Sequence, residues 1–237
     1  MGTKNQNEFA LNSKEEVAKF DDHLRTYIDE LMSSEMGGDF LNFSLAKYYE
    51  KLQDHQNGGR IFSSLLDLKI NAALTLKDIF SFLNTDRQTH SKNNPEKRDV
   101  LDSTHFFRAR MDCHDHLTSF IFRYRAMWDK VMGLMVLITI PDKYESFMQS
   151  KSKKKDFKKL AFKHNLASDE LLNQFLSMIE SFDDKFRTPE AHGTGRLRKW
   201  TFWMGPIIET PQADALFYWA SINEAMHQLE NTLLDSL

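Results

Sequence analysis

Apolar residues recur at alternating steps of three and four positions along most of the chain, a spacing that is typical of amphipathic helices. The clearest stripe runs from Phe106 to Ile138 and is interrupted only at Arg110. At ~1.5 Å per residue this stripe is about 50 Å long, and we expect its helix to be the spine of a bundle. Its apolar positions are Phe106, Cys113, Leu117, Phe120, Tyr124, Met127, Val131, Leu134 and Ile138.

The same spacing predicts further helices before and after this spine. Pro141 should end the spine, because proline cannot donate the next backbone hydrogen bond, although Ile138 to Ile140 could extend as a short strand. The sequence therefore predicts an all-α fold, a multi-helix bundle of about seven or eight helices. The other predicted helical segments are 14–35, 39–53, 61–83, 168–186 and 214–234.

Polar and turn-forming residues divide the chain. They are dense in 84–100, which we expect to be an exposed loop. Residues 1–83 would then form an N-terminal helical layer that packs on a core made of 101–237. A second polar stretch, 150–164, is rich in lysine. Its simplest interpretation is a solvated face or a linker, and the alternative is a surface that attracts an RNA backbone.

Charge and cysteine content narrow the class of protein. The net charge of −3 argues against a basic coat over the whole surface, but it permits a local basic patch. Cys113 is the single cysteine, which excludes an internal disulfide and favours a reducing compartment. No signal peptide is visible, and the longest apolar run, Leu134 to Pro141, is much shorter than the ~20 residues of a membrane span. We expect a cytoplasmic protein with no membrane contact.

Candidate chemistry is concentrated in one segment, where Arg187 and His192 are separated by Thr-Pro-Glu-Ala. The same pattern also occurs at Arg98/His105, Arg108/His114 and Arg110/His116. The last two pairs lie in the predicted spine, where a separation of six residues turns the side chains about 120° apart. Pro189 should break the helix between Arg187 and His192 and let their side chains converge.

This segment contains the groups that metal-free cleavage of RNA requires. Histidine transfers protons near neutral pH, and arginine forms bidentate hydrogen bonds with phosphate. Thr188 is a good N-cap for a helix starting at Pro189, whose free N–H groups would then face a phosphate. Glu190 could orient His192 or only interact favourably with the helix dipole. The remaining candidates for binding the substrate are Gly193, Gly195, Arg196, Arg198 and Lys199.

The spacing of Arg187 and His192 resembles the R-x4-6-H motif of the HEPN superfamily. The resemblance implies a compact all-helical core, here 101–237, and in many members a metal-independent ribonuclease of a toxin–antitoxin or defence system. It also implies a homodimer whose two motifs meet in a cleft, where the 2′-hydroxyl attacks and leaves a 2′,3′-cyclic phosphate. Only Arg187 and His192 match; the family often has Asn, Asp or His where this chain has Thr188, and Pro189 also departs from the pattern.

The expected partners are therefore a second copy of the chain, RNA, and an antitoxin or other protein, with no metal and no cofactor. Two alternatives remain. In the first, the chain is a non-catalytic helical interaction module and its Arg–His motif is structural. In the second, it is a helical metal-binding enzyme that uses His105, Asp112 and His116, which fall on one face of the spine. Otherwise these residues form a polar face with Arg108 and Arg123, which could line the same cleft as Arg187.

Overall fold

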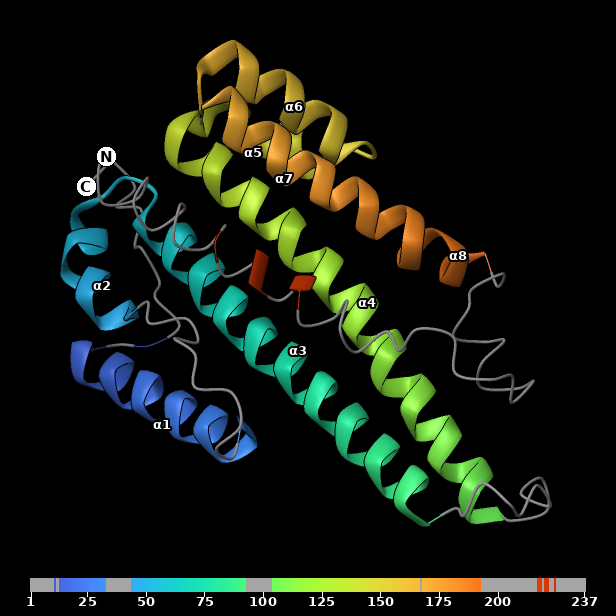
Figure 1. The fold of residues 1–237 in the computed structure, drawn as a ribbon. Helices are drawn as coiled ribbons and strands as arrows, with labels where there is room; N and C mark the ends of the chain where they lie inside the picture. The colour runs from blue at the N-terminus through green and yellow to red at the C-terminus, as the bar shows by residue number, and fades with distance from the viewer. Residues whose placement is uncertain are drawn as a thin grey trace.

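The protein is an all-α, multi-helix bundle in the computed structural model (Figure 1). The residues described are 11, 13–32, 44–92, 104–166, 168–192, 217, 218, 220, 221 and 224. Within these residues there is no strand, and no helix is long and apolar enough to cross a membrane. The helices are α1 (Lys14–Met32), α2 (Leu45–Asp54), α3 (Gly58–Lys92), α4 (Thr104–Thr139), α5 (Pro141–Met148), α6 (Lys153–His164), α7 (Asp169–Phe182) and α8 (Thr188–Ala191).

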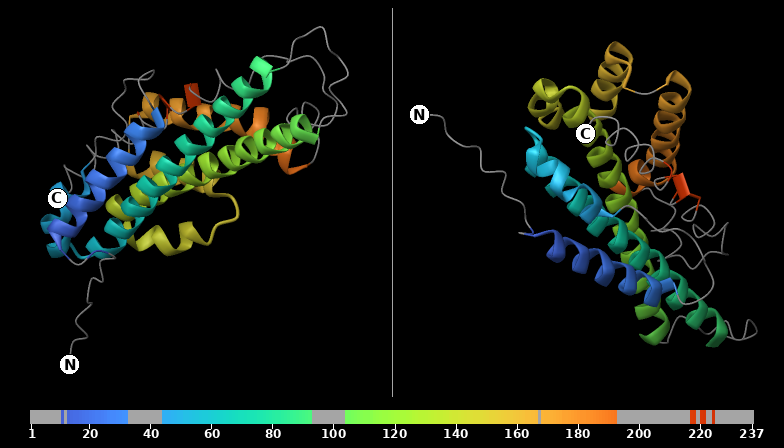
Figure 2. Two further views of the ribbon diagram at one scale, coloured as in Figure 1. Left: turned by 90° about the horizontal axis from the view of Figure 1, so that it is seen from below. Right: turned by 90° about the vertical axis from the view of Figure 1, so that its left-hand side faces the viewer.

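Two long helices, α3 and α4, form an antiparallel pair at the centre of the bundle (Figure 1). α1 and α2 pack on α3, whereas α5 and α6 pack on α4, and α7 packs on α6 (Figures 1 and 2). The apolar stripe that predicts the spine is confirmed, because it forms the buried side of α4 from Cys113 to Ile138. The helix continues to Thr139, so the alternative of a strand at Ile138–Ile140 is wrong.

The segment expected to be a polar loop is helical in its first part. α3 extends to Lys92, so 84–92 add more than two turns beyond the last apolar position that predicted this helix. Polar side chains do not end a helix by themselves, and 84–92 contain neither proline nor glycine. α3 also packs on α4, and the two helices share one buried core.

One buried carboxylate joins the three N-terminal helices. Asp21 of α1 accepts a hydrogen bond from the ammonium of Lys69 on α3 at 2.5 Å. Its other oxygen accepts from the Ser44 hydroxyl at 3.1 Å and from the Ala46 backbone N–H at 3.3 Å, at the start of α2. Both charged side chains are almost fully buried. Several hydrogen bonds thus compensate the cost of removing this ion pair from water.

Aromatic rings fill the space between α4 and the end of α7. Phe182 contacts Tyr124 at a centroid distance of 4.4 Å and Tyr218 at 4.9 Å. The Tyr124 hydroxyl and the Trp128 indole N–H are buried, and neither has a hydrogen-bond partner among the described residues. Burial raises the pKa of Tyr124, and the nearby indole opposes this rise only weakly. This cluster fixes the end of α7 against α4, next to the Arg–His segment.

The turn between α2 and α3 depends on a close backbone approach at Gly58. A Cβ atom there would overlap the backbone carbonyl of Leu52. Gly133 on α4 is also enclosed, but a Cβ there would meet the flexible end of the Met148 side chain at 3.2 Å. Gly58 therefore tolerates no side chain, whereas the surroundings of Gly133 can adjust to one.

We expect Gly58→Ala to lower the free energy of unfolding by about 3 kcal/mol, because the α2–α3 turn must shift to accept the methyl group. Gly133→Ala is the matched control and should change it by less than ~1 kcal/mol, since Met148 can move and alanine favours the helix. Urea unfolding of the two variants measures the difference. Equal losses would contradict this account of the turn.

Candidate functional site

The Arg–His segment lies at the end of a helix that contains a π-helical turn. α7 continues into the π turn η2 (Asp183–Arg187) and then into α8. In η2 the Thr188 N–H donates to the carbonyl of Asp183, five residues earlier. The next turn closes with the His192 N–H donating to the Thr188 carbonyl at 3.1 Å. π turns inside α-helices are frequently found at functional sites.

Pro189 accounts for the position of this turn. A proline inside an α-helix has no N–H for the carbonyl four residues earlier, here that of Lys185, and its ring collides with that carbonyl. A π turn before the proline widens the spacing of the backbone hydrogen bonds, and it relieves this conflict without ending the helix. The expectation that Pro189 breaks the helix is therefore wrong.

The expected helix N-terminus at Thr188 is also absent. Arg187, which precedes it, has helical angles of φ −64° and ψ −51°, and the structure gives α8 no side-chain cap. The first N–H groups of α8 thus continue a helix that began at Asp169, and they do not form an anion site. Thr188 is exposed, and Pro189 and Glu190 are half-buried.

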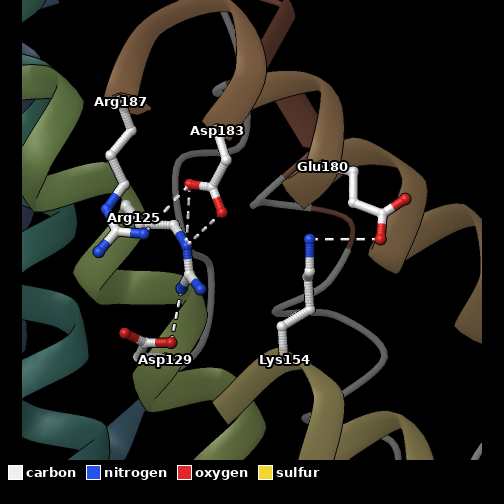
Figure 3. Close-up of polar contacts among 6 residues, drawn as sticks. All are labelled: Arg125, Asp129, Lys154, Glu180, Asp183 and Arg187. Atoms are coloured by element: carbon white, nitrogen blue, oxygen red, sulfur yellow. Dashed lines mark hydrogen bonds and ion pairs between the residues drawn. The ribbon is translucent and has the colours of Figure 1, made fainter. Parts of the chain in front are cut away.

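A buried arginine of α4 anchors the π turn. The Nε atom of Arg125 donates to both carboxylate oxygens of Asp183, at 3.1 and 3.3 Å (Figure 3). Its Nη1 atom donates to Asp129 on the next turn of α4 at 2.5 Å. The Arg125 side chain is only 8% exposed, so its charge depends on these two carboxylates.

Arg187 is the outer member of the same network. Its Nη1 atom lies 3.7 Å from Oδ1 of Asp183, which is an ion-pair distance but too long for a hydrogen bond (Figure 3). The side chain is 46% exposed. Asp183 therefore holds Arg187 loosely, because its carboxylate is already engaged by Arg125, and the guanidinium keeps donors that face solvent.

His192 is exposed at the end of α8, with φ −92° and ψ 4° where the helix stops. Within the described residues the structure gives no contact between His192 and Arg187. On a regular helix a separation of five residues turns two side chains about 140° apart, and the helix is continuous here. The predicted convergence within one chain is thus not observed. Gly193, Gly195, Arg196, Arg198 and Lys199 lie outside the described residues.

The polar face of α4 lies on the side opposite to this network. Arg123 donates through Nε to Asp78 of α3 at 3.2 Å. Burial raises the pKa of Asp78, and the charges of Arg123 and, more weakly, His116 oppose that rise. Nine residues separate His116 from Arg125, which places them about 180° apart on α4. The expectation that this face lines the same cleft as Arg187 is wrong, because α4 itself separates the two.

The metal hypothesis gains no support from the described residues, in which no group of three or more His, Cys, Asp or Glu side chains could hold an ion. Asp112 is exposed and His116 is half-buried, while the His105 side chain is outside the description. His114 instead shares a hydrogen bond with Thr118 at 3.2 Å. The pairs Arg108/His114 and Arg110/His116 lie inside continuous α4, as expected.

Sequence reasoning missed Arg125, Asp129 and Asp183. The available signal was an arginine between Tyr124 and the apolar Met127, with an aspartate four residues after it. This spacing predicts an ion pair on one helix face. The contact with Asp183 joins residues 58 positions apart and could not be inferred from spacing.

No family model, curated protein or solved structure matches this chain. The residues and their geometry are therefore the whole basis for a functional proposal.

We expect Arg125→Met to lower the free energy of unfolding by about 3 kcal/mol, because it removes the cation that pairs with Asp129 and leaves Asp183 with only the long contact to Arg187. Methionine keeps most of the apolar volume, so the loss reports mainly on charge. Urea unfolding measures it.

Arg60→Met is the matched control for that experiment. Arg60 also pairs with a carboxylate, Glu145 at 2.6 Å, but it is 61% exposed. This variant should lose less than ~1 kcal/mol. An Arg125 variant as stable as the Arg60 variant would mean that the network does not hold the π turn in place.

Proposed function

We propose that this chain is a HEPN-like, metal-independent endoribonuclease in which Arg187 and His192 act on the phosphodiester. The observation that carries the proposal is the π turn, which ends at Arg187 and is fixed to the core through Asp183 and Arg125. It places an accessible guanidinium at the end of a rigid element, one turn before an exposed imidazole. Neither side chain contributes to the buried core.

In this proposal the two residues have separate tasks. His192 transfers a proton to or from the reacting oxygens, because an imidazole can act as a general acid or as a general base. Arg187 forms hydrogen bonds with the phosphate and stabilises the charge that develops as the 2′-hydroxyl attacks. No step requires a metal ion. The resemblance further suggests a toxin or defence setting, in which an antitoxin would restrain the activity.

The proposal includes a homodimer. Because Arg187 and His192 diverge on a continuous helix, one chain does not aim both at a single phosphate, and a two-fold axis would supply a second pair. A candidate surface lies on α4, where Phe107, Met111 and Phe122 are exposed. These positions are four and eleven residues apart and therefore share one face of the helix.

A non-catalytic role is the second candidate, and the Arg187–Asp183 ion pair is the observation that favours it. If Arg187 served only to close the helix end against Asp183, the segment would be structural. The chain would then be a helical interaction module that binds a partner without cleaving RNA.

We expect His192→Ala and Arg187→Ala each to reduce cleavage of a fluorescent single-stranded RNA by 100-fold or more, on the order of a general acid–base contribution. Folding should be retained, because both side chains are largely outside the core. Addition of EDTA should leave the rate unchanged.

His164→Ala matches the first variant, since His164 is also an exposed histidine at a helix end, and Arg60→Ala matches the second. Both should cleave RNA like the wild type, as should His116→Ala. Full activity in the His192 variant would refute the catalytic proposal. An intact chain that binds RNA but never cleaves it would favour the non-catalytic role.

We expect the wild-type chain to be a dimer at micromolar concentration when measured by multi-angle light scattering. The double variant Phe107→Asp/Met111→Asp should be monomeric and inactive, because charge on this apolar face opposes association. Ile70→Asp places the same charge at an exposed apolar position of α3 and should remain dimeric. A wild-type monomer would refute the shared cleft.

A further inference from the structure

α6 carries a dense positive surface that the Arg187–His192 chemistry does not use. Lys155, Lys158, Lys159 and Lys163 are all exposed, and Phe162 between them is 40% exposed. In this set of five residues, here called the lysine face, each later residue lies three or four positions after an earlier one. They therefore lie on one side of the helix, along about 12 Å of its axis.

Two carboxylates near α6 form their contacts away from the lysine face. Asp156, the acidic residue of this helix, accepts a hydrogen bond from the Ser150 hydroxyl at 2.6 Å. Glu180 of α7 pairs with Lys154 at 3.2 Å, at the start of α6 rather than on the lysine face. Lys153 also helps to lower the pKa of the half-buried Lys130, after the larger effect of burial. Within the described part of the chain, neither carboxylate forms an ion pair with a lysine of the lysine face.

The apolar side of α6 is not available for a membrane. Phe157 and Ala161 are buried in the core, and Leu160 packs against it. A helix that binds in the plane of a bilayer inserts its apolar face among the lipids, and here that face is used by the fold. A lysine row with a single exposed ring is instead typical of surfaces that track a nucleic-acid backbone and stack one base.

The start of α6 is close to the π turn. The Lys154–Glu180 ion pair joins the start of α6 to α7 beside the Arg125–Asp183–Arg187 network (Figure 3). Glu180 and Arg187 are seven residues apart, which corresponds to roughly 10 Å along the helix. Together with the ~12 Å of the lysine face, this distance corresponds to about seven nucleotides at ~3.4 Å for each stacked nucleotide.

We propose that the lysine face binds the phosphate backbone of single-stranded RNA and leads the strand towards Arg187. This inference rests on the proposed function for its choice of RNA, but it concerns binding and not cleavage. The four lysines contact phosphates, and Phe162 stacks on a base. Sequence preference is weak, because neither phosphate contacts nor stacking read the edges of the bases.

The test measures binding separately from cleavage. The full-length chain carrying His192→Ala is titrated into a fluorescent 12-nucleotide oligouridine, and anisotropy is recorded at several salt concentrations. Replacing the four lysines of the lysine face by glutamine should weaken binding at least ten-fold. It should also reduce the slope of log K against log salt by about 3, since each lost phosphate contact on a single strand contributes roughly 0.7. Phe162→Ala should weaken binding about ten-fold without changing the slope.

A quadruple variant with the same change of charge is the control: Lys19→Gln, Arg25→Gln, Lys51→Gln and Lys77→Gln, all at exposed positions of α1, α2 and α3. For this control, the slope of log K against log salt should change by less than ~1. Equal weakening by both quadruple variants would overturn the proposal, because net charge alone would then explain binding. The proposal also fails if the lysine-face variant binds RNA normally but no longer sediments with vesicles of phosphatidylserine and phosphatidylcholine.

Failure of this inference can be told from failure of the proposed function. If the lysine face governs RNA binding while the wild-type chain cleaves no RNA, the catalytic proposal fails and the inference stands. If the wild-type chain cleaves RNA and the lysine-face variant binds and cleaves it equally well, the inference fails alone. Circular dichroism verifies that every variant is folded.

Discussion

The architecture depends on the burial of α4 on more than one side. One side packs against α3, and a second side meets the end of α7, where Tyr124 contacts Phe182 and Trp128 contacts Phe175. Because Arg125 lies on this second side, a cation is placed where water is largely excluded. Burial of an unpaired charge is far more costly than burial of a paired one. The position of Asp183, and with it the start of the π turn, is therefore constrained by α4.

The charges around Asp183 link the position of this residue to the candidate site. Arg125 and Arg187 face Asp129 and Asp183, so the network is neutral as a whole. The inner arginine has the shorter contacts and the lower exposure, whereas Arg187 has one long ion-pair contact. The two arginines therefore differ in role. Arg125 anchors the backbone of the π turn, and Arg187 retains hydrogen-bond donors that could bind an anion.

The parts of the fold that depend on local periodicity were predictable. The stripe from Phe106 to Ile138 gave the spine almost to its last residue, and the apolar positions of α3 were also found. The extension of α3 through 84–92 was missed, because a run of polar residues carries no periodic apolar signal. Pro189 led to a wrong prediction for another reason. A proline ends a helix only if the preceding turn cannot change its hydrogen bonding, and here that turn is the π turn η2. The sequence predicted Arg187 and His192 as a candidate pair, but the ion pair of Arg187 with Asp183, and the link of Asp183 to Arg125, required the tertiary structure.

The π turn acts as one extra residue placed in an otherwise regular helix. Each residue of an α-helix advances the chain by about 100° around the axis, so an insertion of one residue re-aims everything that follows it. The number of residues between Phe182 and Thr188 therefore decides which direction the end of this helix presents to solvent, independently of the residue types there. Length, and not only chemistry, is thus under constraint in this segment: a deletion of one residue that left every named side chain in place would still turn Thr188, Glu190 and His192 towards a different part of the surface.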